Sequence, residues 1–140
     1  DNDVRDEQFE MLAGFIQRHA DTSIPVLLIG DMNTAGDATQ MSDSKSQYNR
    51  MLSTLRKSDV PFVDLWTIHG TASGGTSDPD SSSGGKRIDY LFAANPRTGM
   101  MLKAGGVQVK KFPDPRVEFL SDHCAIEGWF ELSASPQVKP

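Results

Sequence analysis

"SIPVLLIGD", Ser23–Asp31, is the stretch of sequence that decides the fold. Its centre, Val26–Ile29, is a continuous apolar run that ends at Gly30. Such a run is typical of a β-strand that is covered on both faces. The preceding segment spaces its apolar residues close to a helical period, which predicts a helix over about Val4–Ala20. A helix that leads directly into a buried strand predicts a layered α/β fold.

The rest of the chain alternates predicted elements with polar connections. "SQYNRMLSTLRKS", Ser46–Ser58, has the apolar spacing of a helix, and Asp43 or Ser44 is its expected N-cap. Strands or extended segments are predicted at Val60–Trp66, Arg87–Ala93, Val107–Pro113 and Cys124–Leu132. Residues 133–140 are expected to form a frayed tail.

One connection stands apart in length and composition. "GTASGGTSDPDSSSGGK", Gly70–Lys86, is rich in Gly, Ser and Asp and has almost nothing to bury, so it is predicted to be a flexible surface loop. Loops this long inside a domain are usually either functional or poorly ordered. A hydroxyl from Thr71 or Thr76 could touch a phosphate, but a flexible loop residue is the interpretation we favour for both.

Composition and charge bound the class of protein. At 140 residues with 37% hydrophobic content, the chain can bury one core of ordinary size, as one domain or part of one. A formal net charge of -5 excludes a bulk electrostatic attraction to nucleic acid or to an anionic membrane. No apolar run is long enough for a stable membrane span. The single cysteine, Cys124, excludes an intramolecular disulfide and is compatible with a secreted bacterial or a cytoplasmic protein.

Polar side chains that could bind a metal or take part in catalysis lie at the ends of the predicted strands. Asp31 and Asn33 follow the first strand, and Asp89 lies in the opening of "RIDYLFA". Asp122 and His123 come immediately before the last strand. Sites in layered α/β proteins collect at strand ends, where adjoining apolar runs hold the side chains rigidly.

Each group also has a plain structural interpretation when it is taken alone. "GDMN" fits a turn, "RID" fits an exposed ion pair, and "SDH" fits a helix cap or an ordinary loop. Their occurrence together, in this order and each beside a strand, favours a functional site.

Three motifs carry a resemblance to a known family. "PVLLIGDMN", "KRIDYLF" and "LSDHCAI" resemble the C-terminal signature motifs of the endonuclease/exonuclease/phosphatase superfamily, the DNase I-like metal-dependent phosphoesterases. "RDEQFEMLAGFI" is similar to the segment with Arg and Gln that precedes the first motif in that family, so the likeness spans Arg5 to about Leu132. The resemblance implies a four-layer αββα sandwich. Residues 1–132 would supply its C-terminal half, one mixed, largely antiparallel sheet with covering helices.

The resemblance also implies a role for each matching residue. Asp31 would contact the attacking water or a metal-bound group, and Asn33 would donate a hydrogen bond to the scissile phosphate. Asp89 would orient the site, with Arg87 bracing it and binding substrate. His123 would bind a nonbridging phosphate oxygen.

Asp122 would hold the imidazole of His123 or lie on the metal, which makes Asp31 and Asp122 the expected metal ligands. An Asp beside a His raises the pKa of the imidazole and so favours the cation that meets phosphate. Oxygen ligands without a Cys or His cluster indicate Mg²⁺ or Mn²⁺.

Members of the superfamily also carry an N-terminal half, with an Asn, a metal-binding Glu and a further active-site His that have no counterpart here. The resemblance therefore implies a phosphoesterase that needs this half, covalently joined or as a separate chain, and that is a poor enzyme alone. Its substrate would be a phosphoester in nucleic acid, phospholipid or a small phosphodiester. Two alternatives stay open: a sphingomyelinase-like lipid phosphodiesterase, and a non-catalytic binding module that retains the fold.

Overall fold

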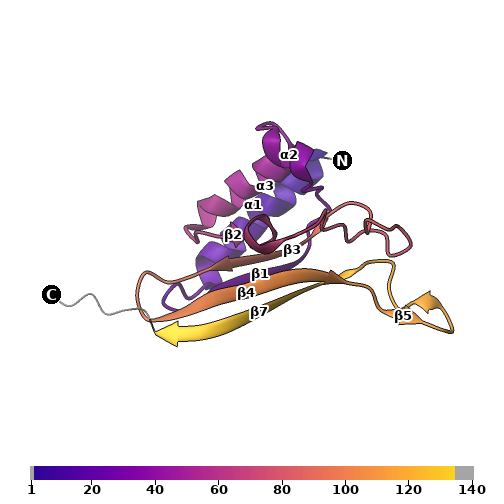
Figure 1. The fold of residues 1–140 in the computed structure, drawn as a ribbon. Coiled ribbons are helices and arrows are strands. Elements are labelled where there is room, and N and C mark those ends of the chain that lie inside the picture. Colours follow the sequence, from indigo (N-terminus) through magenta and orange to yellow (C-terminus); the bar gives the residue numbers. More distant parts are fainter. Residues whose placement is uncertain (1, 135–140) are drawn as a thin grey trace.

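Helices come early in the chain and the long strands late (Figure 1). The structure is a computed structural model, and it describes residues 2–134. The helical elements are α1 (Asn2–His19), α2 (Ala38–Ser42), α3 (Gln47–Leu55), the 3-10 helix η1 (Arg56–Ser58) and α4 (Trp66–His69). The strands are β1 (Val26–Asp31), β2 (Val63–Asp64), β3 (Asp89–Ala94), β4 (Met100–Lys110), β5 (Pro113–Asp114), β6 (Glu118–Phe119) and β7 (Ala125–Ala134).

Within residues 2–134 the strands form three separate antiparallel sheets, so the prediction of one mixed sheet is wrong. β3 lies between β1 and β2 in a three-stranded sheet. β4 pairs with β7 in a long ribbon, and β5 pairs with β6 in a short hairpin. β4 and β7 pair from Met100↔Ala134 to Lys110↔Ala125, and this two-stranded ribbon forms a separate β layer. The predicted combination of α-helices with largely antiparallel strands is confirmed.

The helical layer covers one face of the three-stranded sheet. Figure 1 shows α1 and α3 side by side on the side of β1 and β3 that faces away from the β4–β7 ribbon. The core between these helices and the sheet consists of Phe9, Ile16, Tyr48, Met51, Leu55, Val60, Tyr90, Phe92 and Ala94.

The N-terminus of α3 differs from the prediction. Ser46 is the N-cap, because its side chain accepts a hydrogen bond from the Asn49 backbone N–H at 3.2 Å. Asp43, one of the two predicted caps, instead ends α2, a short helix in a segment that reads as a polar loop. Asp37 begins α2 by accepting from the Gln40 N–H, an N-cap signal present in the sequence.

The β4–β7 ribbon packs on the opposite face of β3. Leu91 and Ala93 of β3 meet Val107 of β4 and the partly buried Phe130 of β7. Gly128 allows this close crossing, because a Cβ there would lie 2.4 Å from Leu91 Cδ2. The chain therefore has a helical layer, a central sheet and a second β layer.

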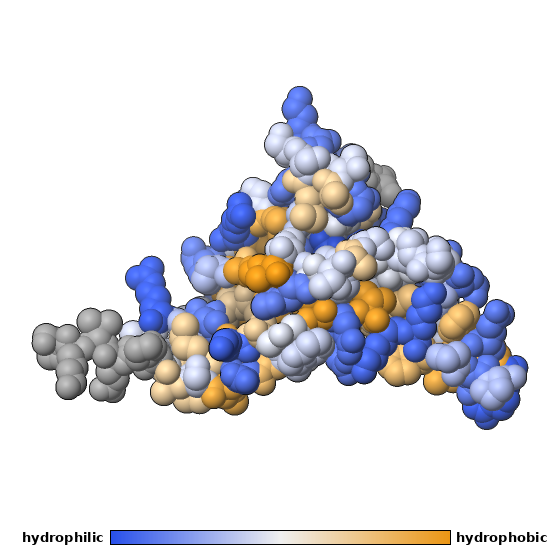
Figure 2. Space-filling model, viewed as in Figure 1, coloured by the Kyte–Doolittle hydropathy of each residue, from blue (hydrophilic) through white to orange (hydrophobic). Residues whose placement is uncertain are grey.

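The outer face of β1 is uncovered within residues 2–134. Leu27 is 40% exposed and Ile29 is 57% exposed, so the prediction that this strand is covered on both faces is wrong for these residues. The ribbon packs on β3 and leaves the neighbouring outer face of β1 open. Figure 2 shows hydrophobic patches at the level of the β layers, beneath a helical layer with a mainly hydrophilic surface.

The Gly- and Ser-rich segment is not a flexible surface loop throughout. Gly74, Gly75 and Thr76 are buried, and the backbone of Thr76 is hydrogen-bonded to that of Lys86. Thr71 is exposed, as predicted. At the other end of the chain, β7 continues to Ala134, two residues into the predicted tail, whose remaining residues, 135–140, lie outside the described part.

Across residues 2–134, no helix combines the length and apolar character needed to span a membrane.

The two methionines Met51 and Met11 test this core. Met51 is completely buried between α3 and the sheet, whereas Met11 on α1 is 73% exposed. Met51→Ala is expected to lower the free energy of unfolding by about 2–5 kcal/mol, because a buried side chain is lost and a cavity remains. Met11→Ala is the matched control and should change it by less than about 0.5 kcal/mol. Chemical denaturation measures both, and equal effects would contradict the described packing.

Candidate functional site

The end of β1 presents Asp31 and Asn33 as one unit. Asp31 Oδ1 accepts a hydrogen bond from the Asn33 backbone N–H at 2.7 Å, and Oδ2 accepts from Asn33 Nδ2 at 3.1 Å. Asn33 has a φ of 48°, a left-handed conformation that Asn tolerates better than most residues. This local turn holds the carboxamide beside the carboxylate, and both side chains are exposed to solvent.

Antiparallel pairing brings a second carboxylate to the same place. Asp89, the first residue of β3, lies directly opposite Asp31. The Met32 N–H donates to the Ile88 carbonyl at 2.9 Å, which makes Asp31 and Asp89 a non-hydrogen-bonded pair. Side chains approach most closely at such pairs. Like charges at directly opposite positions destabilise a sheet, so this arrangement favours a cation between them.

His123 completes the cluster from the segment before β7. Its Nδ1 lies 2.9 Å from Asp89 Oδ2, and both side chains are partly buried. One ligand atom from each of Asp31, Asp89 and His123 lies within 4.8 Å of the other two. The two carboxylates at this separation, with the imidazole beside them, form an oxygen donor set that fits a divalent cation.

The acidic surroundings of His123 decide its protonation. Partial burial lowers the pKa of the imidazole, but the hydrogen bond and the negative charge of Asp89 outweigh it, with smaller contributions from Asp31 and Asp122. The pKa of His123 is therefore raised above its ordinary value of 6.5. The cluster favours an imidazolium, the form that can donate from both ring nitrogens.

The prediction that Asp122 holds the imidazole is wrong, since Asp89 makes that contact. Asp122 is exposed and does not belong to the group of ligand atoms formed by Asp31, Asp89 and His123. The contact between Asp89 and His123 arises from the tertiary fold, so adjacency in the sequence does not place the Asp122 carboxylate on the imidazole.

Arg87 has a different environment from the predicted one. It is 1% exposed, and its Nη1 lies 2.8 Å from Asp64 Oδ2. Its Nε donates to the Gly36 carbonyl at 2.9 Å, and its guanidinium lies over the rings of Tyr48 and Tyr90. The predictions that Arg87 braces Asp89 and binds substrate do not match this buried position.

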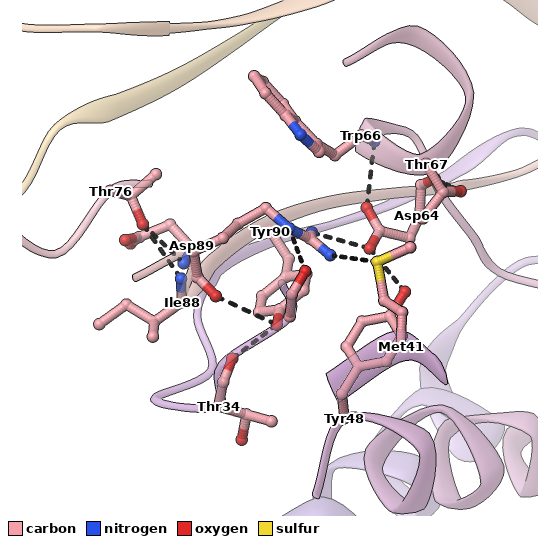
Figure 3. A network of polar contacts seen from close by, with 12 residues as sticks. Thr34, Met41, Tyr48, Asp64, Trp66, Thr67, Thr76, Ile88, Asp89 and Tyr90 are labelled. Carbon is pink, nitrogen blue, oxygen red and sulfur yellow. Dashed lines mark hydrogen bonds and ion pairs between the residues drawn. The ribbon is translucent and has the colours of Figure 1, made fainter. Parts of the chain in front are cut away.

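The buried network that includes Arg87, Asp64 and Tyr90 holds the loop after Asn33 instead, and Figure 3 shows Tyr90 beside Thr34 of that loop. Gly36 N–H donates to the Arg87 carbonyl at 2.9 Å, and the Tyr90 hydroxyl donates to the Thr34 carbonyl at 2.6 Å. A Cβ at Gly36 would lie 2.3 Å from the Tyr90 hydroxyl, so only glycine permits this close approach. The loop that carries Asn33 is thus tied to the residues that begin β3.

Asp64 and Tyr48 were missed by sequence reasoning. Asp64 accepts hydrogen bonds from the Tyr48 hydroxyl at 2.9 Å and from the Trp66 backbone N–H at 3.1 Å. Burial, together with the charge of Asp64, raises the pKa of Tyr48 to about 12. A signal did exist, because the single acid in the apolar "VPFVDLW" must be paired if that segment is buried.

Comparison with known proteins adds a family match. A sequence model of the Endonuclease/Exonuclease/phosphatase family matches residues 1–123. The matched span includes Asp31, Asn33 and Asp89 and ends at His123. No curated protein matches the chain significantly.

The pKa of His123 tests the geometry of the cluster. In metal-free buffer, Asp89→Asn should lower this pKa, because the carboxylate that raises it most is lost and the effect of burial remains. Because the pKa of His123 is raised in the folded state, protonation of His123 stabilises the folded protein. This contribution to the free energy of unfolding is fully present below pH 6.5 and is lost as the pH rises through the folded-state pKa.

NMR titration of the His123 ring signals measures this pKa. Asp122→Asn is the matched control and should lower it less, because Asp122 contributes least among the three carboxylates. A larger effect of Asp122→Asn than of Asp89→Asn would refute the described pairing.

Proposed function

Because the chain belongs to the Endonuclease/Exonuclease/phosphatase family, we propose that it carries the site of a divalent-metal-dependent phosphodiesterase. This family generally hydrolyses phosphoester bonds. The observation that supports the proposal best is the convergence of Asp31, Asp89 and His123, whose ligand atoms lie within 4.8 Å of one another. Asn33 adds a hydrogen-bond donor at the same edge of the sheet.

The carboxylates of Asp31 and Asp89 would hold the cation. They face each other across two paired strands, and hard oxygen donors suit Mg²⁺ or Mn²⁺. A bound cation neutralises phosphate charge and stabilises the leaving oxygen during hydrolysis. Asp122, which the sequence predicts as a ligand, lies outside this group of atoms and is not needed in the proposed site.

His123 would bind a nonbridging phosphate oxygen. Asp89 occupies Nδ1, which leaves Nε2 to face the substrate. The acidic surroundings favour the imidazolium, and a charge-assisted hydrogen bond to phosphate is about twice as strong as a neutral one. Asp89 therefore fixes both the orientation and the charge of the donor.

Asp31 and Asn33 would act on the attacking water and on the phosphate. The Asp31 carboxylate is exposed, so it can orient a water molecule and accept its proton. Asn33 uses one N–H of its carboxamide on Asp31, and its second N–H is directed to the phosphate in our proposal.

The proposed enzyme also includes the N-terminal half that the family resemblance implies. The outer face of β1 offers a place for it, because Leu27 and Ile29 are exposed beside the covered face of β3. An additional layer on this face would complete a sandwich and add further polar groups next to Asp31. We propose that full activity requires that half, covalently joined or as a separate chain.

Hydrolysis of bis(p-nitrophenyl) phosphate tests the function. The complete protein should release p-nitrophenol with Mg²⁺ or Mn²⁺ and should lose this activity in EDTA. His123→Ala is expected to lower kcat by about 100-fold or more, because it removes the phosphate donor. His19→Ala, on the exposed surface of α1, is the matched control and should leave kcat unchanged. Metal-independent turnover, or equal activity of the two histidine variants, would contradict the proposal.

A further inference from the structure

We propose that Thr76 is a positioning residue that fixes the Asp89–His123 pair from the buried part of the Gly- and Ser-rich segment. The inference rests on the proposed function, since it assigns the support of the same site. Thr76 is completely buried, so it acts through Asp89 and His123 and does not touch substrate.

The hydroxyl of Thr76 holds the backbone at Asp89. Its Oγ1 accepts hydrogen bonds from the Ile88 N–H at 3.2 Å and from the Asp89 N–H at 3.1 Å (Figure 3). Asp89 forms a non-hydrogen-bonded pair with Asp31, so its N–H points away from β1 toward the β2 side of the sheet.

β2 does not reach far enough to satisfy this N–H. Its pairing with β3 covers Ala93 and Phe92, and a last hydrogen bond joins the Leu65 N–H to the Leu91 carbonyl. Beyond that point the Thr76 hydroxyl takes the place of a neighbouring strand. A buried N–H needs an acceptor, and here a side chain supplies it at the residue that carries the site carboxylate.

The backbone of Thr76 holds the other member of the pair. Its carbonyl accepts from the Cys124 N–H at 2.7 Å, and Cys124 directly follows His123 and is buried. The Thr76 N–H donates to the Lys86 carbonyl at 2.8 Å, which anchors the segment itself. One residue therefore bridges β3 and the start of β7, the two elements whose side chains meet in the 2.9 Å contact between Asp89 and His123.

The preceding glycines allow Thr76 to reach this position. Gly74 has a φ of 71°, and a Cβ at Gly75 would lie 2.3 Å from the Ser83 carbonyl oxygen. The segment turns back closely on itself and inserts Thr76 between the two strands. The segment therefore holds Thr76 in a fixed position between β3 and Cys124, although its composition is typical of a flexible loop.

Two substitutions separate the hydroxyl from the shape of the side chain. Thr76→Val keeps the branched shape and loses the acceptor, whereas Thr76→Ser keeps the acceptor and loses the methyl group. Positioning by the hydroxyl predicts that Val is the damaging change. Simple packing predicts that Ser is the damaging change.

The control is Ser58→Ala in η1. Ser58 is also buried and its hydroxyl also accepts a backbone N–H, from Val60 at 3.4 Å, but it lies among the residues that follow α3. It therefore reports the effect of losing a buried hydroxyl elsewhere in the protein.

Amide hydrogen exchange and steady-state kinetics on the complete protein provide the readouts. In Thr76→Val, the Asp89 and Ile88 amides should exchange at least about tenfold faster than in the wild type. The kcat on bis(p-nitrophenyl) phosphate should fall about 10- to 100-fold with KM nearly unchanged, because moving a catalytic group by about 1 Å lowers the rate by up to about 100-fold. Thr76→Ser and Ser58→Ala should retain the wild-type kcat and the protection of both amides.

The outcomes are distinguishable from a failure of the proposed function. Wild-type protection of the Asp89 amide in Thr76→Val, or loss of kcat in Thr76→Ser, would overturn the role of the hydroxyl. If Thr76→Val does not fold, Thr76→Ser decides the question alone. If the wild type shows no turnover, the proposed function fails, and amide exchange together with the hydrogen-bonded Nδ1–H signal of His123 still tests the positioning.

Discussion

The site depends on a buried ion pair between Arg87 and Asp64. Both side chains are almost fully removed from water, and neither charge could remain there without the other. Arg87 also donates to the Gly36 carbonyl, so the pair is joined to the loop that carries Asn33. Asp89, two residues after Arg87 in the chain, belongs to the cluster with Asp31 and His123. The start of β3 is thus the point to which the whole site is attached.

The residues that stabilise the site differ from those proposed to bind the cation and substrate. Arg87 and Asp64 are buried and have hydrogen-bond partners, whereas Asp31 and Asn33 are exposed to solvent. Two carboxylates that face each other across paired strands lower the stability of the sheet. The buried ion pair and the aromatic rings of the core hold them in place, and a bound cation would relieve their repulsion. An unfavourable local arrangement supported by a rigid core is common at functional sites.

The sequence predicted which residues of the candidate site lie at strand ends better than it predicted their contacts. The predicted strands alone place four polar residues at or next to strand ends: Asp31, Asn33, Asp89 and His123. The partner of His123 was wrongly predicted, because the contact with Asp89 spans 34 residues and arises only from the tertiary fold.

The fold shows the same difference between local and long-range information. The helices α1 and α3 and the strands β1 and β3 follow from local periodicity and apolar runs. The division into three sheets depends on long-range pairing, which periodicity does not encode. The burial of Thr76 was missed because the composition of its segment does not reveal that its hydroxyl accepts hydrogen bonds from two backbone N–H groups.

Binding of Mn²⁺ to isotope-labelled protein, followed by paramagnetic broadening of backbone amide signals, tests the central claim most directly. The account predicts that the signals of Asp31, Asn33, Asp89 and His123 broaden first, and broadening centred on the exposed acids Asp78 and Asp80 would contradict it.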